Sequence, residues 1–393
     1  MLSISNNVSL PKNNSQFLKT PNSAAAFFDG TNDYIDASTL GSSISKTAGT
    51  ISHWVKITAS SNNEILFSVS DGTSGNDKIQ TVFMTNTSSG QFQAVYKSGG
   101  VANKAVYNYP AVDIVGAGWF HLAMTYTITE ENALTIKLYF NGALQNTFSG
   151  VADTIAEGVA FDRVILGKNA NADNSYLQGF IDECAYYTRV LTADEILRIY
   201  NAKGTFNHIT QTDVDSADGV NLLKQWLRFG DGGNDFASDQ TTGIVDMSNN
   251  SLGSELVTDG DFSNASSFNL TVGNPTISGG TGNFPDTTNS FIIQSSVVPA
   301  SVKVYTLQYE VVESNGDLLR LAGGNSAFGT IALDSSVGLH STIITSNGSQ
   351  TSLQFNNAAA FIGKIDNISL KEVQGNPAFT SGALINQDDN PTA

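Results

Sequence analysis

The 393-residue chain is long for a single hydrophobic core, so two or three domains are expected. Hydrophobic residues make up 40% of the chain and charged residues only 14%, and Ser, Thr, Asn and Gly dominate the remainder, a composition typical of all-β proteins. The 19 basic and 36 acidic residues give a formal charge of −17, which opposes binding to nucleic acid or to an anionic membrane.

The cellular compartment is indicated by what the sequence lacks. One cysteine, Cys184, excludes an intramolecular disulfide and a cysteine-cluster metal site. The first residues show no basic and apolar regions of a signal peptide, and no apolar run reaches membrane-spanning length. We therefore expect a soluble protein that is made in a cytoplasm and is not exported by the general route.

The polar residues 1–22 predict an N-terminal arm, either flexible or anchored to a larger assembly. After the arm, turn-punctuated segments with no helical alternation between them predict a β-sandwich. Asn141-Gly142 after an alternating run is the strongest short hairpin signal. Further strands are predicted within 26–35, 49–57, 64–69, 91–96, 118–126, 135–140 and 161–167.

The segment 179–196 predicts a strand that turns directly into a short helix. Thr192 can serve as the N-cap, with Glu195 completing a capping box. Leu191 and Ile196 then occupy the positions of a hydrophobic staple. This helix is expected to close the first sandwich near residue 204.

Five spaced motifs resemble laminin-G-like, concanavalin A-like lectin domains, and the resemblance covers residues 23–203. It implies a sandwich of two antiparallel sheets. The motifs are Phe28-Asp29-Gly30 with Asp33-Tyr34-Ile35, Thr50-Ile51-Ser52-His53-Trp54-Val55-Lys56, Trp119-Phe120-His121-Leu122-Ala123-Met124-Thr125-Tyr126, Leu138-Tyr139-Phe140-Asn141-Gly142, and Gly179-Phe180-Ile181-Asp182-Glu183.

A second module is predicted at residues 255–373. Its first strand, 255–263, and its last, 364–373, resemble the side-by-side terminal strands of carbohydrate-binding-module jelly rolls. Residues 204–254 are expected to be a connector packed on the first sandwich, and residues 374–393 a polar tail. The predicted fold class is thus all-β, with two antiparallel β-sandwich (jelly-roll) modules in tandem and one short helix closing the first.

A catalytic role is disfavoured because no catalytic constellation is visible. The Glu-x-Asp-x-x-Glu pattern of sandwich glycanases is absent, and the adjacent Asp182 and Glu183 should point to opposite faces of a strand. The four histidines, His53, His121, His208 and His340, have no metal-ligand spacing. We therefore predict that the protein is not an enzyme.

Asp182 is a candidate ligand for structural calcium. In strict alternation it shares a core-facing side with Cys184 and Tyr186, where a carboxylate needs a partner. Resemblance to laminin-G-like domains implies calcium at Asp29 and Asp182. The alternative is that Asp29 closes its own turn and Asp182 caps the strand-to-helix crossing through backbone hydrogen bonds.

Candidate ligand-binding residues lie in polar, turn-rich segments, whereas Trp54 and Trp119 are expected to pack in the sandwich. The candidates are Tyr107, Tyr109, Tyr176 and Asn174. The second module lacks the tryptophans that its relatives often carry after the first strand, which argues against glycan binding there.

The paired modules resemble virion structural proteins of marine tailed bacteriophages. This resemblance implies a non-enzymatic head decoration, fibre or spike on the virion, contacting other capsid or tail proteins and host-surface glycans, as a homo-oligomer. Assembly in the host cytoplasm would agree with the missing signal peptide. The alternative is a bacterial surface or secreted glycan-binding adhesin, and the third hypothesis is a glycanase.

Overall fold

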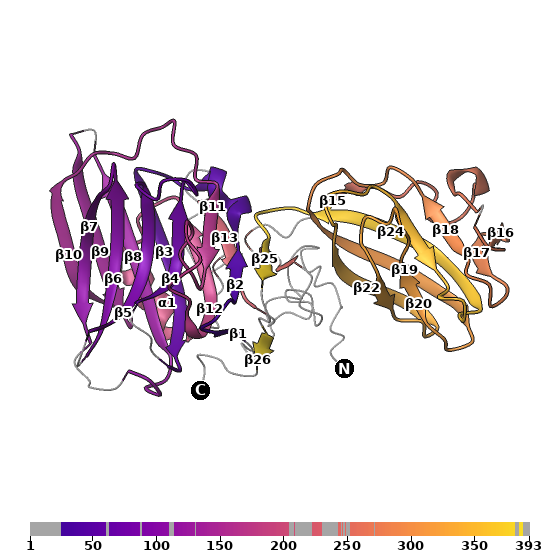
Figure 1. Cartoon of the computed structure of the whole chain (residues 1–393), viewed down its shortest axis with the longest axis horizontal. Coiled ribbons are helices and arrows are strands. Elements are labelled where there is room, and N and C mark those ends of the chain that lie inside the picture. The colour runs from indigo at the N-terminus through magenta and orange to yellow at the C-terminus, as the bar shows by residue number, and fades with distance from the viewer. Residues whose placement is uncertain are drawn as a thin grey trace, which may run out of the picture. The chain divides into compact units, whose positions relative to one another are not determined.

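The structure is a computed structural model, and its described residues form two compact units built almost entirely of antiparallel strands (Figure 1). The first unit comprises Met1–Phe236 with Ser381–Ala393, and the second comprises Ala237–Thr380. This confirms the all-β fold class. The predicted arm, residues 1–22, lies outside the described residues, which are 25–59, 63–86, 89–109, 114–129, 131–203, 208, 222–229, 243–244, 246, 248, 252–270, 272–381 and 385–387.

The first unit contains two sheets, named sheet A and sheet B. Sheet A has the strand order β10 (Ala143–Val151), β9 (Ala133–Phe140), β8 (Phe120–Ile128), β3 (Ala48–Ile57), β12 (Gln178–Tyr187), β1 (Ala25–Asp29) and β26 (Ile385–Gln387), and β13 (Leu223–Leu227) also pairs with β12. Sheet B has the order β2 (Tyr34–Asp36), β11 (Arg163–Leu166), β4 (Asn63–Ser70), β5 (Lys78–Asn86), β6 (Ser89–Ser98) and β7 (Val101–Asn108). A short 3-10 helix, η1 (Ser38–Ser43), follows β2.

Aromatic side chains from both sheets meet between them and form the sandwich core. Phe92 of β6 lies 5.1 Å, centroid to centroid, from Phe140 of β9. Tyr96 of β6 lies 5.8 Å from Tyr126 of β8. Alternation therefore directs Phe83, Phe92 and Tyr96 of sheet B inward and their neighbours along β5 and β6 outward.

The predicted hairpin at Asn141-Gly142 is confirmed. Phe140 pairs with Ala143 across the turn, so the loop has two residues. Both have positive φ angles, 50° for Asn141 and 76° for Gly142, as a type I′ turn requires. Local sequence alone accounts for this connection between β9 and β10.

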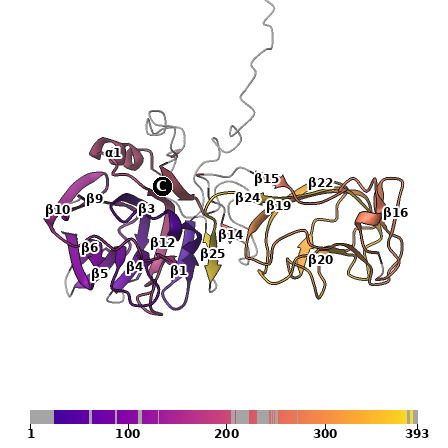
Figure 2. The same cartoon turned by 90° about the horizontal axis from the view of Figure 1, so that it is seen from above.

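The predicted helix is α1 (Ala193–Asn201), and its capping box is present. The Thr192 hydroxyl accepts a hydrogen bond from the Glu195 backbone N–H at 3.3 Å, and Glu195 accepts one from the Thr192 backbone N–H at 2.7 Å. Leu191 and Ile196 are both buried, as the staple predicts. Figure 2 shows α1 on the side of sheet A that faces away from β4, β5 and β6.

Strand β12 carries a bulge that the sequence analysis did not anticipate. Asp182 pairs with Trp54 and Ala185 with Ser52, so β12 has one extra residue there. Glu183 adopts a left-handed backbone conformation with φ of 47°. The expectation that Asp182 shares a face with Tyr186 is wrong. Asp182 pairs with Trp54 and Tyr186 pairs with Ile51, and Trp54 and Ile51, three residues apart on β3, point to different faces.

Two segments that follow the first sandwich in sequence return to sheet A. Within the predicted connector, β13 pairs with β12, with Trp226 opposite Ala185. Within the predicted tail, β26 pairs with β1, with Ile385 opposite Phe27. Sheet A is therefore completed by residues distant in the chain.

The second unit also contains two sheets, sheet C and sheet D. Sheet C has the order β16 (Thr276–Ser278), β17 (Thr281–Phe284), β24 (Gly363–Val373), β19 (Val304–Ser314) and β22 (Gly338–Thr345), with β15 (Leu252–Glu255) also paired to β24. Sheet D has the order β18 (Phe291–Gln294), β23 (Leu353–Asn356), β20 (Leu319–Leu321) and β21 (Ile331–Leu333). The 3-10 helix η3 (Ala265–Ser267) precedes β16. Strand β14 (Gly243–Ile244) pairs with β25 (Ala378–Ser381), and the two belong to sheet B.

The first and last strands of the second module pair side by side, as predicted, but the first strand spans Leu252–Glu255 and not 255–263. Glu255 of β15 lies opposite Lys371 of β24. The Glu255 carboxylate also accepts hydrogen bonds from the Leu370 backbone N–H at 2.8 Å and the Ser369 hydroxyl at 2.5 Å. Between the two sheets, Tyr309 of β19 packs edge-on against Phe355 of β23.

Among the described residues, no helix has the length and apolar character needed to span a bilayer.

Candidate functional site

The two predicted calcium ligands lie too far apart to bind the same ion. Asp29 pairs with Gln178 across β1 and β12. Asp182 is four residues further along β12, a distance of about 13 Å at ~3.3 Å per residue. Two ligands of one calcium ion lie within about 5 Å of each other, since each is ~2.3–2.6 Å from the ion.

Each of these carboxylates has a backbone partner. Asp29 Oδ1 accepts a hydrogen bond from the Thr31 backbone N–H at 2.7 Å and closes its own turn. Asp182 Oδ1 accepts one from the Glu183 backbone N–H at 2.7 Å. Among the described residues, no three His, Cys, Asp or Glu side chains are grouped so as to hold a metal ion. Calcium binding stays a prediction.

Two of the predicted ligand-binding tyrosines pack against the sandwich core. The Tyr107 ring lies 4.9 Å from Phe140, and the Tyr109 ring lies 5.3 Å from Phe120. Tyr107 is opposite Phe92, a core residue, so its side chain is directed toward sheet A. Both tyrosines are only partly exposed and fill the edge of the sandwich.

The other two candidates, Tyr176 and Asn174, lie in the segment 168–177, which borders sheet B at β4. The Ile65 backbone N–H donates to the Ser175 carbonyl at 3.0 Å. The ammonium group of Lys168 lies over the Tyr34 ring at 4.1 Å and 5.9 Å from the Tyr176 ring. Lys168 also pairs with Asp173 at 2.5 Å. These contacts hold the segment in place beside the sheet.

On the outer face of sheet A, packing buries the residues of β3 and β12 that lie next to α1. Trp54, predicted to be a core residue, is 3% exposed and stacks on Tyr200 of α1 at 5.8 Å. His121 beside it shares a hydrogen bond with the Ser52 hydroxyl, with His121 Nε2 and Ser52 Oγ 2.9 Å apart. Burial lowers the pKa of His121 to about 3, so its imidazole is neutral at physiological pH.

A buried ion pair lies on the same face, at the β12 bulge. Glu183 accepts hydrogen bonds from Arg228 Nε at 3.0 Å and from Trp226 Nε1 at 2.5 Å. The Glu183 and Arg228 side chains are 3% and 5% exposed. Trp226 pairs with Ala185, which pairs with Ser52, so Trp226 lies on the same face as Ser52 and Trp54. Glu183 reaches Trp226 on this face, and Asp182, opposite Trp54, points to it as well. The prediction from alternation that Asp182 and Glu183 point to opposite faces is therefore wrong. Glu183 holds β13 on the sheet.

The outer face of sheet B has a different chemistry: side-chain amides lie next to one another across β4 to β7. Gln80 Nε2 donates to the Ser68 hydroxyl at 2.7 Å. Gln91 Nε2 donates to Asn108 Oδ1 at 2.8 Å, and Gln93 donates to Gln91 Oε1. Gln80 and Gln93 are 8% and 5% exposed, whereas Asn108 is exposed on the edge strand β7.

A small apolar cluster lies among these amides. Ile65, Val82 and Val95 pack together on this side of the sheet, and Met84 contacts them. Val82 pairs with Gln93, and Val95 with Gln80, so amide and apolar side chains alternate across the strands. We call the surface formed by these residues, together with Gln91 and Asn108, the amide face.

Two lysines lie directly opposite each other at one end of the amide face. Lys78 of β5 pairs with Lys97 of β6. Lys78 Nζ donates to Asn169 Oδ1 at 3.2 Å, and Lys97 Nζ donates to the Gly75 carbonyl at 2.9 Å. Burial and the charge of Lys97 lower the pKa of Lys78, and Asp71 partly opposes this shift.

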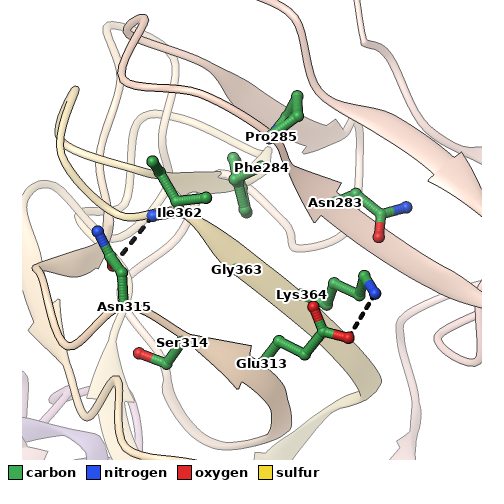
Figure 3. A pocket seen from close by; sticks show the side chains of 9 residues that line it. All are labelled: Asn283, Phe284, Pro285, Glu313, Ser314, Asn315, Ile362, Gly363 and Lys364. Atoms are coloured by element: carbon green, nitrogen blue, oxygen red, sulfur yellow. Dashed lines mark hydrogen bonds and ion pairs between the residues drawn. The ribbon is translucent and has the colours of Figure 1, made fainter.

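The second unit contains an open hollow of about 480 Å³ between the ends of β17, β19 and β24 (Figure 3). Its lining includes Ile362, which is 39% exposed, and the Glu313–Lys364 ion pair at 2.5 Å. The amide of Asn283 donates to the Thr276 and Thr281 carbonyls of its own hairpin. The amide of Asn315 accepts from the Ile362 backbone N–H and donates to the Ala360 carbonyl. Both amides thus serve local turns.

Comparison with known proteins finds a family profile that matches most of the first sandwich. Residues 29–197 match the profile of the concanavalin A-like lectin/glucanases superfamily. This agrees with the predicted concanavalin A-like domain. No curated protein sequence matches the chain.

Several solved structures are similar to part of the chain. The carbohydrate-binding module CBM40 of the Ruminococcus gnavus IT-sialidase is 21% identical, with 45% of this chain and 96% of that chain covered and a TM-score of 0.38. A SAP-like pentraxin from Limulus polyphemus is 12% identical, covers 46% and 82%, and has a TM-score of 0.34. NanB sialidase from Streptococcus pneumoniae is 15% identical, covers 70% and 34%, and has a TM-score of 0.35. At these scores the likenesses carry no argument about function.

The amide face was missed by the sequence analysis, which predicted β6 but not β5 or β7. The signal was present in composition. Strands β5, β6 and β7 contain three lysines, Lys78, Lys97 and Lys104, and no aspartate or glutamate. Strands β8, β9 and β10 of sheet A also lack carboxylates but contain a single lysine, Lys137, so the lysine content is what sets β5, β6 and β7 apart.

Proposed function

We propose that the first unit is a non-catalytic carbohydrate-binding domain whose binding surface is the amide face. The observation that carries the proposal is the set of adjacent amides, Gln80, Gln91, Gln93 and Asn108, around an apolar cluster on the outer side of sheet B. The superfamily match of residues 29–197 supports it, since that superfamily comprises lectins and glucanases.

The chemistry of the amide face suits a sugar. A side-chain amide both donates and accepts hydrogen bonds, as sugar hydroxyl groups require. Met84, which is partly exposed and packs on the buried cluster of Ile65, Val82 and Val95, can contact the C–H faces of pyranose rings. Tyr176 and Asn174, predicted from sequence as ligand-binding residues, lie in the segment that borders this face and could extend the contact.

Hydrolysis of a glycoside on this face is disfavoured. Glycosidases place two carboxyl groups roughly 5–9.5 Å apart across the scissile bond. Strands β5, β6 and β7 have no carboxylate, and Glu64 of β4 is opposite Phe83, on the core side, and 1% exposed. A surface of amides can hold a saccharide but has no general acid for its cleavage.

The setting in which the domain acts follows only from resemblance. The pairing of a laminin-G-like module with a jelly roll supports display on a tailed-phage virion, and a bacterial surface or secreted adhesin is the alternative. Mass spectrometry of purified particles against host-cell fractions separates the two settings. Recovery of the chain only from cell envelopes or culture medium would exclude the virion.

Binding is tested with the full chain on a glycan array, followed by titration calorimetry with the strongest array ligands. The double variant Gln80→Ala/Gln91→Ala should bind at least about tenfold more weakly, because each amide supplies hydrogen bonds worth ~0.5–1.5 kcal/mol. The matched control is Gln145→Ala on β10, an exposed glutamine of sheet A. Silence of the wild type across the array, or equal binding by the double variant, would overturn the proposal.

A further inference from the structure

The lysine pair Lys78 and Lys97 is unusual in its electrostatics. The two residues are directly opposite in register, where side chains of like charge repel. Cross-strand Cβ atoms at such positions are only about 4.5–5.5 Å apart. An arrangement that brings two ammonium groups together in a chain of net charge −17 calls for a compensating anion.

Among the described residues, neither ammonium group forms an ion pair with a carboxylate, although the charge of Asp71 acts on Lys78. The partners of the two ammonium groups are neutral oxygens, Asn169 Oδ1 for Lys78 and the Gly75 carbonyl for Lys97. Two carboxylates lie in the neighbouring turn, and each serves backbone groups. Asp71 Oδ1 accepts hydrogen bonds from the Ser74 and Gly75 N–H groups, and Asp77 Oδ1 accepts one from Gly99 N–H.

The position of the pair links it to the amide face. Gln80 is two residues from Lys78 on β5, and Val95 is two residues from Lys97 on β6, so all four side chains point to the same side of sheet B. About 6–7 Å separates residues two apart along a strand, roughly the length of one sugar unit. Lys104 of β7, opposite Val95, is exposed and adds a third positive charge beside them.

We propose that Lys78 and Lys97 form an anion subsite and that the amide face therefore selects saccharides bearing a carboxylate or a sulfate ester. The anionic group receives hydrogen bonds from both ammonium groups, while the amides Gln80 and Gln91 bind the hydroxyl groups of the same or the next sugar. This inference rests on the proposed function and specifies its ligand class.

The test compares neutral and anionic forms of the same saccharide with the full chain. The probes are oligogalacturonate against its methyl ester, for the carboxylate, and dextran sulfate against dextran, for the sulfate ester. At least one anionic member should bind tenfold or more tightly than its neutral partner, and the preference should shrink as the salt concentration rises. The charged member that is preferred identifies the anionic group.

The variants Lys78→Gln and Lys97→Gln keep hydrogen-bonding capacity but remove one charge each. Each should weaken binding of the preferred anionic probe about five- to tenfold, whereas Lys137→Gln on β9 of sheet A should leave binding unchanged. Equal binding of neutral and anionic partners, or an equal loss in all three variants, would refute the anion subsite. If neutral and anionic partners bind equally but the double variant Gln80→Ala/Gln91→Ala still weakens binding, the proposed function stands without the anion subsite. If no saccharide binds, both proposals fail.

Discussion

The two outer faces of the first sandwich differ in how their polar groups are used. On sheet A, α1 packs over β3, and beside it the polar groups are buried and paired, as in the Glu183–Arg228 ion pair. On sheet B, the amides Gln80, Gln91 and Gln93 bond mainly to neighbouring side chains on the same surface. One face is therefore committed to stability, and the other keeps groups that a ligand can engage.

The comparison has an energetic basis. Removing the partner of a buried charge, or protonating a buried neutral histidine, lowers the free energy of unfolding by several kcal/mol. The more exposed amides of the amide face, Gln91 and Asn108, can exchange their hydrogen bonds with water or a ligand at a net cost of about 0.5–1.5 kcal/mol each. Perturbing sheet A should thus unfold the unit, whereas perturbing sheet B should change binding. All three tryptophans, Trp54, Trp119 and Trp226, lie in the first unit, so tryptophan fluorescence reports its unfolding alone.

Acid should have the largest effect, acting through the buried histidines. Burial lowers the pKa values of His53, His121 and His208 to about 3, below the value of 6.5 in an unfolded chain. The stability they contribute is present above pH 6.5 and is lost as the pH falls toward 3, since the unfolded chain takes up protons first. Each histidine contributes a slope of up to about 1.4 kcal/mol per pH unit.

Urea denaturation followed by tryptophan fluorescence at pH 7, 6 and 5 measures this dependence. The variant His121→Asn removes one titrating group from the covered face of sheet A. It should reduce the slope of the free energy of unfolding against pH by the contribution of one histidine. A free energy of unfolding that is constant from pH 7 to pH 5 would show that these histidines are not held neutral by the fold.

The next largest effect is expected at the ion pair on sheet A. The variant Arg228→Met leaves the Glu183 carboxylate buried without its cation, which should lower the free energy of unfolding by about 3–5 kcal/mol. Arg163→Met, at an exposed arginine of β11, is the matched control and should change it by less than about 0.5 kcal/mol. Equal losses in the two variants would contradict the division between the two faces.

The smallest effect on stability is expected on the amide face. Gln91→Ala removes hydrogen bonds to Asn108 and from Gln93, all near the surface, and should change the free energy of unfolding by about 0.5 kcal/mol or less. Its midpoint in urea should match that of the wild type. A loss above 2 kcal/mol would mean that sheet B, like sheet A, uses its outer polar groups for stability.

Much of the fold could be predicted from sequence because its signals are local. Asn141-Gly142 specifies a tight turn through its positive φ angles, and Thr192 with Glu195 specifies the start of α1 through hydrogen bonds three residues apart. The site was harder to predict. Tyr107 and Tyr109 have the composition of a polar loop, yet the curvature of the sandwich edge turns both rings onto Phe140.

The sequence by itself determined many of the strands, the Asn141-Gly142 turn, the cap of α1 and the all-β class, but not β5 or β7. Only tertiary structure decided the bulge at Asp182–Ala185, because Glu183 reaches Trp226 and Arg228, more than 40 residues later, only with an extra residue in β12. It also decided the amide face. Gln80, Gln91 and Asn108 become neighbours through the register of β5, β6 and β7, and register depends on which faces the two sheets bury against each other.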